Sequence, residues 1–206
     1  GSLEGIKNMS DFFEVREKTV EGAQWRGSIS LTHETEEGIQ VERQLTVRQL
    51  RDPEFFKVMK MIDRDELNEL QDNMPKDLMN EYNELQDQEE LDEEEVERLS
   101  ELEDEIEAEA PNMFEVLSEE TFNGIRKAGE YGVEPDPEDL RKILYEYADE
   151  VEEAYDVEPK SDADDCVYNY FKEYLLPDML DKSTDFQSFV IGMEVLVETM
   201  GGEEGN

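Results

Sequence analysis

DQEELDEEEVERLSELEDEIEAE, residues 87–109, contains fourteen acidic residues and one base, Arg98. Four apolar residues recur within it at steps of three, three and four: Val96, Leu99, Leu102 and Ile106. Such steps place side chains on one face of an α-helix, so these residues form a narrow apolar stripe. The carboxylates must occupy the rest of the helix surface and face water.

The residues before this stretch predict a second helix beside the first. They also show helical spacing of apolar side chains: Leu78, Met79, Tyr82 and Leu85. Asp92 and Glu95 have the spacing of an N-cap residue and its N3 partner, which indicates a break near residues 87–91. Residues of about 75–110 are therefore predicted to form a projecting acidic helical hairpin.

The whole chain is strongly acidic, with 59 Asp and Glu against 19 Lys and Arg, a formal net charge of −40. Three explanations compete: intrinsic disorder, an anionic decoy or cation binder, and a source whose cytoplasm is molar in salt. Nine Phe, eight Tyr and one Trp provide material for a core and argue against disorder. At molar salt the Debye length is about 3 Å, so self-repulsion is screened. We therefore favour a halophilic protein, from a haloarchaeon or one of its viruses.

A β-hairpin is predicted near the N-terminus, around the turn Glu36-Glu37-Gly38. Apolar residues alternate with polar ones on both sides of this turn: Trp25, Ile29 and Leu31, then Ile39, Val41, Leu45 and Val47. Two strands are marginal alone, so their apolar face must lie on helices, on a third strand between Phe12 and Val20, or on a partner chain.

We expect the partner-binding surface to lie on this hairpin. The first 60 residues are nearly neutral, with eleven acids and nine bases, unlike the rest of the chain. The residues expected to bind the partner are Trp25, Ile29, Ile39 and Val41.

The remaining sequence predicts helices. Asp63, Ser118 and Asp136 mark helix starts, and Gly129 and Gly132 are expected to end the helix that begins at Ser118. The helix that begins at Asp136 is predicted to be strongly amphipathic, with an unbroken apolar stripe from Leu140 to Tyr155. Another helix is expected to stop at Pro177, and the last to run from residue 184 or 185 to Gly201.

The fold class predicted from these patterns is α+β: a mostly α-helical body with a small N-terminal antiparallel β-hairpin or sheet and a projecting acidic helical hairpin. Residues 1–9 are expected to be disordered or an expression remnant, and residues 10–63 to hold the β-hairpin and first helix. Residues 64–200 form the acidic helical body with its arm, and residues 201–206 a disordered tail.

No residue pattern in the sequence points to catalysis or to a cofactor. The single histidine, His33, lies near the end of a strand, and Cys166 is followed by apolar and aromatic residues typical of a buried thiol. One Cys and one His cannot supply a structural zinc site. The acidic cluster at 161–165 lacks the glycine of a calcium loop. We expect no enzyme activity, no cofactor and no metal.

The sequence has one basic cluster, which consists of Arg43, Arg48, Arg51, Lys57 and Lys60. Nucleic-acid binding needs a broad basic face, so we expect no direct nucleic-acid binding. The basic cluster is interpreted as ion pairs to the protein's own acids or to an acidic partner. No apolar run of about 18 residues occurs, so we expect no membrane partner and a cytoplasmic location, the host cytoplasm for a viral protein.

A near-neutral hairpin leads through LTVRQLRDPEFFKVM, residues 45–59, into the acidic helical body. This order resembles the tail assembly chaperones of tailed viruses, which coat the tape-measure protein during tail building. The resemblance implies a non-enzymatic assembly or protein-interaction protein that binds a protein partner or forms a homo-oligomer. The alternative is an acidic DNA mimic, in which carboxylates replace phosphates in the groove of a DNA-binding protein.

The charge predicts that stability depends on salt. We expect the melting temperature to rise by about 10 °C or more between about 0.1 and 3 M KCl, because salt screens self-repulsion. Thermal melts followed by circular dichroism measure this rise. A melting temperature that stays flat across the range would contradict salt adaptation.

Overall fold

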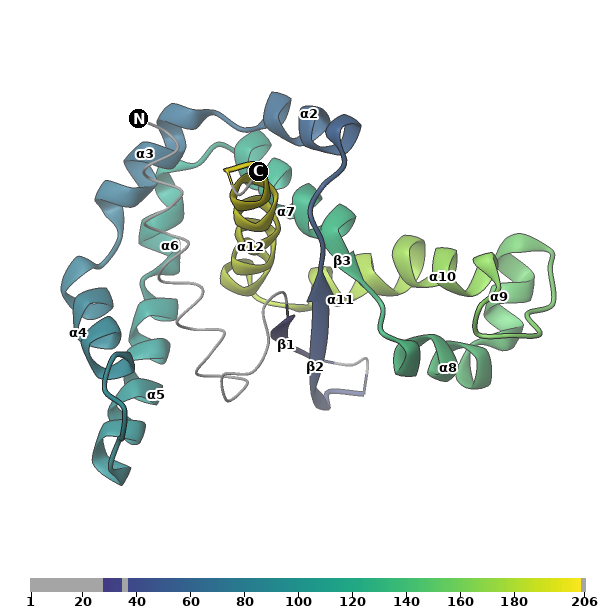
Figure 1. Ribbon diagram of the computed structural model, residues 1–206, viewed down its shortest axis with the longest axis horizontal. Coiled ribbons are helices and arrows are strands. Elements are labelled where there is room, and N and C mark those ends of the chain that lie inside the picture. Colours follow the sequence, from purple (N-terminus) through teal and green to yellow (C-terminus); the bar gives the residue numbers. More distant parts are fainter. Residues whose placement is uncertain (1–27, 35–36, 205–206) are drawn as a thin grey trace.

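The computed structural model describes residues 28–34 and 37–204 (Figure 1). The strands are β1 (Ser28–Glu34), β2 (Gln40–Val47) and β3 (Val133–Glu134). The helices of the first half are α2 (Asp52–Met61), α3 (Arg64–Asn73), α4 (Lys76–Gln86), α5 (Glu93–Ala108), α6 (Ala110–Met113) and the 3₁₀ turn η1 (Phe114–Val116). Those of the second half are α7 (Glu119–Gly132), α8 (Pro137–Glu146), α9 (Ala148–Tyr155), α10 (Asp165–Tyr170), the π-helical turn η2 (Phe171–Leu175), α11 (Leu176–Lys182) and α12 (Asp185–Glu204).

The protein is mostly α-helical with a small antiparallel sheet, which confirms the predicted fold class. Helices α7 and α12 lie at the centre, and α2 and α3 lie above them in Figure 1. The α4–α5 hairpin projects at the lower left, and α8, α9 and α10 project at the right.

The sheet has the order β1-β2-β3 and is antiparallel throughout. Strands β1 and β2 form the predicted hairpin, with Ser28 opposite Thr46 and Glu34 opposite Gln40. Gly38 has φ 83° in the turn, a conformation that glycine adopts without steric cost. The third strand is β3, which pairs with the end of β2. The segment Phe12–Val20, one predicted source of a third strand, lies outside the described residues.

The core is built around a close crossing of α7 and α12. A Cβ atom added to Gly192 of α12 would lie 2.0 Å from the carbonyl oxygen of Ile125 in α7. On its other side, α7 contacts α2, where a Cβ at Gly124 would lie 2.8 Å from the Cβ of Met61. Small residues thus let α7 approach two helices at once.

This crossing corrects one predicted helix end. Gly129 lies inside α7, and the helix continues to Gly132. A Cβ at Gly132 would lie 2.3 Å from Val195, and one at Gly129 would lie 3.1 Å from Ile191. Gly129 therefore permits helix packing and does not terminate α7.

The predicted helix from Leu140 to Tyr155 is interrupted. Tyr147 leaves the helical region at φ −122° and ψ 18°, which divides the stretch into α8 and α9. The Tyr147 N–H still donates to the Ile143 carbonyl, and its own carbonyl accepts from the Val151 N–H, both at 2.9 Å. The apolar stripe therefore continues around a bend of one residue.

The predicted stop at Pro177 is also wrong. The chain continues from α10 through η2 into α11, and Pro177 lies in the first turn of α11. Proline is tolerated there because the first-turn N–H groups have no partner within the helix. Helix α12 likewise runs past Gly201, where the prediction ended it, to Glu204.

The acidic hairpin forms as predicted. Asp92 caps α5 and accepts from the Glu95 N–H at 2.8 Å, while the Glu95 carboxylate accepts from the Asp92 N–H. Leu99, Leu102 and Ile106 are buried. Arg98 binds Glu81 of α4 through two hydrogen bonds of 2.8 and 2.9 Å, which lower the pKa of the Glu81 carboxyl. Carboxylates cover the remaining surface of the arm.

The crossing predicts a large effect of one methyl group. Gly192→Ala should lower stability by about 3 kcal/mol or more, a fall in melting temperature of about 10 °C, because helix backbones would have to separate. Gly129→Ala is the matched control. Its Cβ would lie 3.1 Å from the Ile191 side chain and no closer than 3.5 Å to the backbone of Gly192. Alanine also favours helix, so we expect a change within about 1 kcal/mol. Equal effects of the two substitutions in urea unfolding would show that the backbones of α7 and α12 are not in close contact at Gly192.

Candidate functional site

The apolar face of the hairpin begins in the core and ends in solvent. Along β2, Leu45 and Val47 are buried, Val41 is half-buried, and Ile39 at the turn is 56% exposed. Alternate residues of a strand share one face, so these four residues lie in one row that leaves the core toward the turn. Arg43, which pairs with Asp139, occupies the same face between Val41 and Leu45 and separates the inner apolar pair from the outer one. The outer half of the row is the exposed part.

The predicted partner-binding residues are only partly placed. Ile39 and Val41 lie at the exposed end of the row. The backbone of Ile29 pairs with that of Leu45, which lies two residues before Val47, the last residue of β2. Trp25 lies outside the described residues. The structure therefore brings Ile39 and Val41 together and leaves the partner role of all four as a prediction.

A polar cluster holds the inner end of the hairpin. Arg48 donates two hydrogen bonds of 2.9 Å to the Glu54 carboxylate of α2 and one of 2.6 Å to Glu134 of β3. These bonds lower the pKa of Glu54 and raise that of Arg48, so the pair stays ionised. The backbone N–H of Arg48 also donates to the Gly132 carbonyl at 2.8 Å. One residue thus joins the hairpin to α2 and to the end of α7.

Helices α10 and η2 complete the cluster. The Tyr168 hydroxyl donates to Glu134 at 2.6 Å, and burial together with this bond raises the tyrosine pKa to about 12. Lys172 in η2 donates to the carbonyls of Tyr131 and Val133 at the end of α7. Burial lowers the pKa of Lys172 to about 8, despite the nearby carboxylate of Glu134.

This cluster is best described as a structural junction. Every polar contact named above joins two elements of secondary structure, and both carboxylates are engaged by Arg48. A lysine with a lowered pKa can act as a base or nucleophile. Here its amine is directed at two backbone carbonyls, an arrangement that caps the end of α7. Sequence reasoning missed Glu134, Tyr168 and Lys172, because contacts over 34 to 86 residues leave no local pattern.

A small pocket of about 70 Å³ lies beside the hairpin, between β2, α8 and η2. Arg43 of β2 lies 3.6 Å from the Asp139 carboxylate at its edge. Burial and the neighbouring Asp136 raise the pKa of Asp139. Among its ten lining residues, Arg43 and Asp139 form an ion pair, and five others are apolar or aromatic: Ile143, Tyr147, Phe171, Leu175 and Met179. So small a space suits a seam between elements more than a ligand site.

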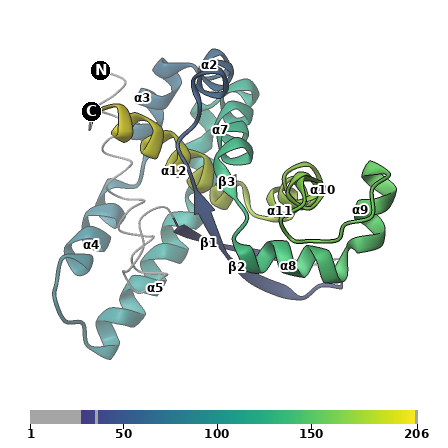
Figure 2. The same cartoon turned by 45° about the vertical axis from the view of Figure 1, so that its right-hand side comes forward.

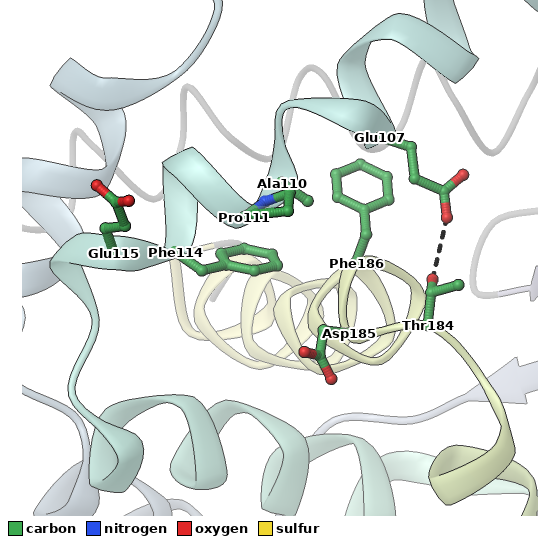
Figure 3. A pocket seen from close by; sticks show the side chains of 8 residues that line it. All are labelled: Glu107, Ala110, Pro111, Phe114, Glu115, Thr184, Asp185 and Phe186. Carbon is green, nitrogen blue, oxygen red and sulfur yellow. Dashed lines mark hydrogen bonds between the residues drawn. The ribbon is translucent and has the colours of Figure 1, made fainter.

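A larger depression of about 470 Å³ lies between α6 and the start of α12 (Figure 3). Phe114 and Phe186 form its aromatic wall, and Thr184 donates a 3.0 Å hydrogen bond to Glu107 at its edge. Among its described lining residues, the charged groups are all carboxylates. Anions such as phosphates would be repelled here by these carboxylates.

The two other residues considered for catalysis, Cys166 and His33, both lie within regular secondary structure. Cys166 is buried in α10, and the backbone of His33 pairs with Val41 within the hairpin. Within residues 28–34 and 37–204, no group of three or more metal-binding side chains comes together. No helix in this part of the chain has the length and apolar character needed to cross a membrane.

The predicted basic cluster divides into two groups. Arg43 and Arg48 pair with the protein's own carboxylates, as one of the two interpretations expected. Arg51, Lys57 and Lys60 are exposed, and the described part of the chain places no carboxylate within 4.0 Å of their side chains.

Comparison with known proteins gave no match to a family model, a curated protein or a solved structure.

Lys172 predicts a specific pH dependence of stability. Between about pH 8 and 10.5 the amine is largely neutral in the folded chain but protonated in the unfolded chain, so unfolding takes up a proton. Raising the pH across this window should therefore stabilise the wild type relative to Lys172→Met. Urea unfolding at pH 8, 9 and 10 measures this difference, with exposed Lys160→Met as the control. A difference that is constant with pH would show that burial in the folded chain does not lower the pKa of the Lys172 amine.

Proposed function

We propose that this protein is a non-enzymatic assembly or interaction protein of a salt-adapted organism, and that it binds a protein partner through the outer half of its β-hairpin. The observation that carries this proposal is the face of β2 that holds the buried Leu45 and Val47 and, beyond Arg43, the more exposed apolar residues Val41 and Ile39. Apolar residues that extend a core into solvent are typical of interaction sites.

The charge distribution supports the same surface. Residues 1–60 carry a net charge of −2, from eleven acids and nine bases, whereas residues 61–206 carry the remaining −38. At molar salt, long-range electrostatic attraction is weak, so binding has to depend on apolar contact. The hairpin offers apolar contact where repulsion is smallest.

The firm attachment of the hairpin also suits binding. Arg48 fixes its inner end to α2 and β3, so a partner at the outer end would meet a preorganised strand pair. Preorganisation reduces the entropy lost on binding. Coating of an extended client during viral tail building is the specific form of this proposal that the resemblance supports.

The test replaces one exposed apolar side chain by a charge. We expect Ile39→Asp to weaken partner binding about tenfold or more at about 2 M KCl, because a carboxylate would be desolvated in the interface. Val157→Asp is the matched control, since Val157 is 52% exposed and follows α9, outside the hairpin. Capture of partners from a host lysate, with helix content checked by circular dichroism, measures both variants. Equal binding by Ile39→Asp and wild type would remove the hairpin as the interface.

A further inference from the structure

Helix α2 presents an unusual surface for so acidic a protein. Phe56 is 65% exposed, and Lys57 and Lys60 are exposed beside it. Val58, on the opposite side of the helix, is buried against α7, so Phe56 faces away from the body. We call Phe56, Lys57 and Lys60 the α2 basic face.

Within the part of the chain that the structure describes, the lysines of this face lack the ion pairs that most other bases have. Among the fifteen bases within residues 28–34 and 37–204, eight pair with a carboxylate, and Lys172 binds two carbonyls. The six others in this part of the chain are Arg51, Lys57, Lys60, Arg64, Lys76 and Lys160. Three of these six, Arg51, Lys57 and Lys60, lie on α2 or directly before it, and Arg64 begins the next helix. The unpaired positive charge of the described chain is therefore concentrated around Phe56.

The distal end of the acidic arm has the complementary chemistry. Val96 is 54% exposed there, although Leu99, Leu102 and Ile106 of the same stripe are buried. Glu93 and Glu97 are exposed and lie beside Val96 on α5, three residues before it and one after it. An exposed apolar side chain is thus flanked by two carboxylates, as Phe56 is flanked by two ammonium groups.

The two surfaces cannot meet within one molecule. In both views α2 lies at the upper edge of the protein, and the end of the arm lies at the lower edge (Figures 1 and 2). Contact between them therefore requires two copies. Because each copy carries one surface of each kind, the contact is head-to-tail, and repeated contacts generate a ring or a filament.

We propose that the α2 basic face binds the distal arm of a second copy, with Phe56 and Val96 in apolar contact and Lys57 and Lys60 opposite Glu93 and Glu97. This contact is separate from the hairpin. The carboxylates of a foreign acidic protein would form ion pairs with the lysines but would not provide an apolar contact for Phe56. The arm of a second copy also supplies an exposed apolar residue between its carboxylates.

The test uses charge reversal in the full-length chain at about 0.5 M KCl, where the Debye length lies between about 3 and 8 Å. Contact ion pairs persist at this salt concentration, while long-range repulsion is reduced. In sedimentation equilibrium we expect the wild-type mass to rise above 24.0 kDa with concentration. Lys57→Glu/Lys60→Glu should weaken self-association about tenfold or more, and so should Glu93→Lys/Glu97→Lys.

Mixing these two double variants identifies the occupant. One has a reversed α2 face with a normal arm, and the other has a normal α2 face with a reversed arm. Each repels itself, but the mixture offers complementary contacts in both directions and should associate as the wild type does. The matched control is Lys76→Glu/Lys160→Glu, which makes the same charge change at two lysines elsewhere that have no ion pair in the described chain, and it should associate like the wild type.

Three outcomes would overturn the proposal. They are a wild type that stays at 24.0 kDa, a Lys57→Glu/Lys60→Glu variant that associates as the control does, and a mixture that stays monomeric. The last result would mean that an acidic surface other than the arm covers α2. Circular dichroism of each variant separates lost contact from lost folding. Ile39→Asp tests the hairpin independently, because it leaves both of these surfaces unchanged.

Discussion

The close crossing of α7 and α12 is the constraint on which the other parts of the structure depend. Gly192 brings the two helix backbones together, and Gly124 on another side of α7 admits α2. Because α7 is fixed on both sides, its C-terminal end has a defined position. That end supplies β3, the Gly132 carbonyl bonded to Arg48, and the carbonyls bonded to Lys172. The hairpin and the α8–α10 helices are therefore both positioned by one central helix.

The sequence predicts local structure well where short-range chemistry decides it. The cap at Asp92, the turn at Gly38 and the alternation along β2 each act within a few residues, and the structure has all three. Prediction failed where distant packing decides the outcome. Gly129 has the residue type of a helix end, but Ile191, which is 62 positions away, determines why it is glycine.

The candidate site shows the same division. The exposed end of the hairpin follows from alternation and charge, so Ile39 and Val41 could be chosen from the sequence. The junction around Glu134 and Lys172 could not, because its members come from β2, α2, β3 and η2. Nor does sequence indicate which bases pair within the chain. Arg48 and Lys57 belong to one basic cluster, yet only the first has a carboxylate within reach in the described structure.

The ion pair between Arg98 and Glu81 has a consequence for how the protein unfolds. Arg98 is the one base within residues 87–109, and it joins α5 to α4 across a hairpin covered by carboxylates. In dilute buffer this arm combines dense repulsion with a narrow apolar stripe, so we expect it to open locally at a lower free energy than α7 and α12. Its amide hydrogens should then exchange with solvent faster than those in α7 and α12. Because salt screens the repulsion, the rate of this exchange should fall as the ionic strength rises.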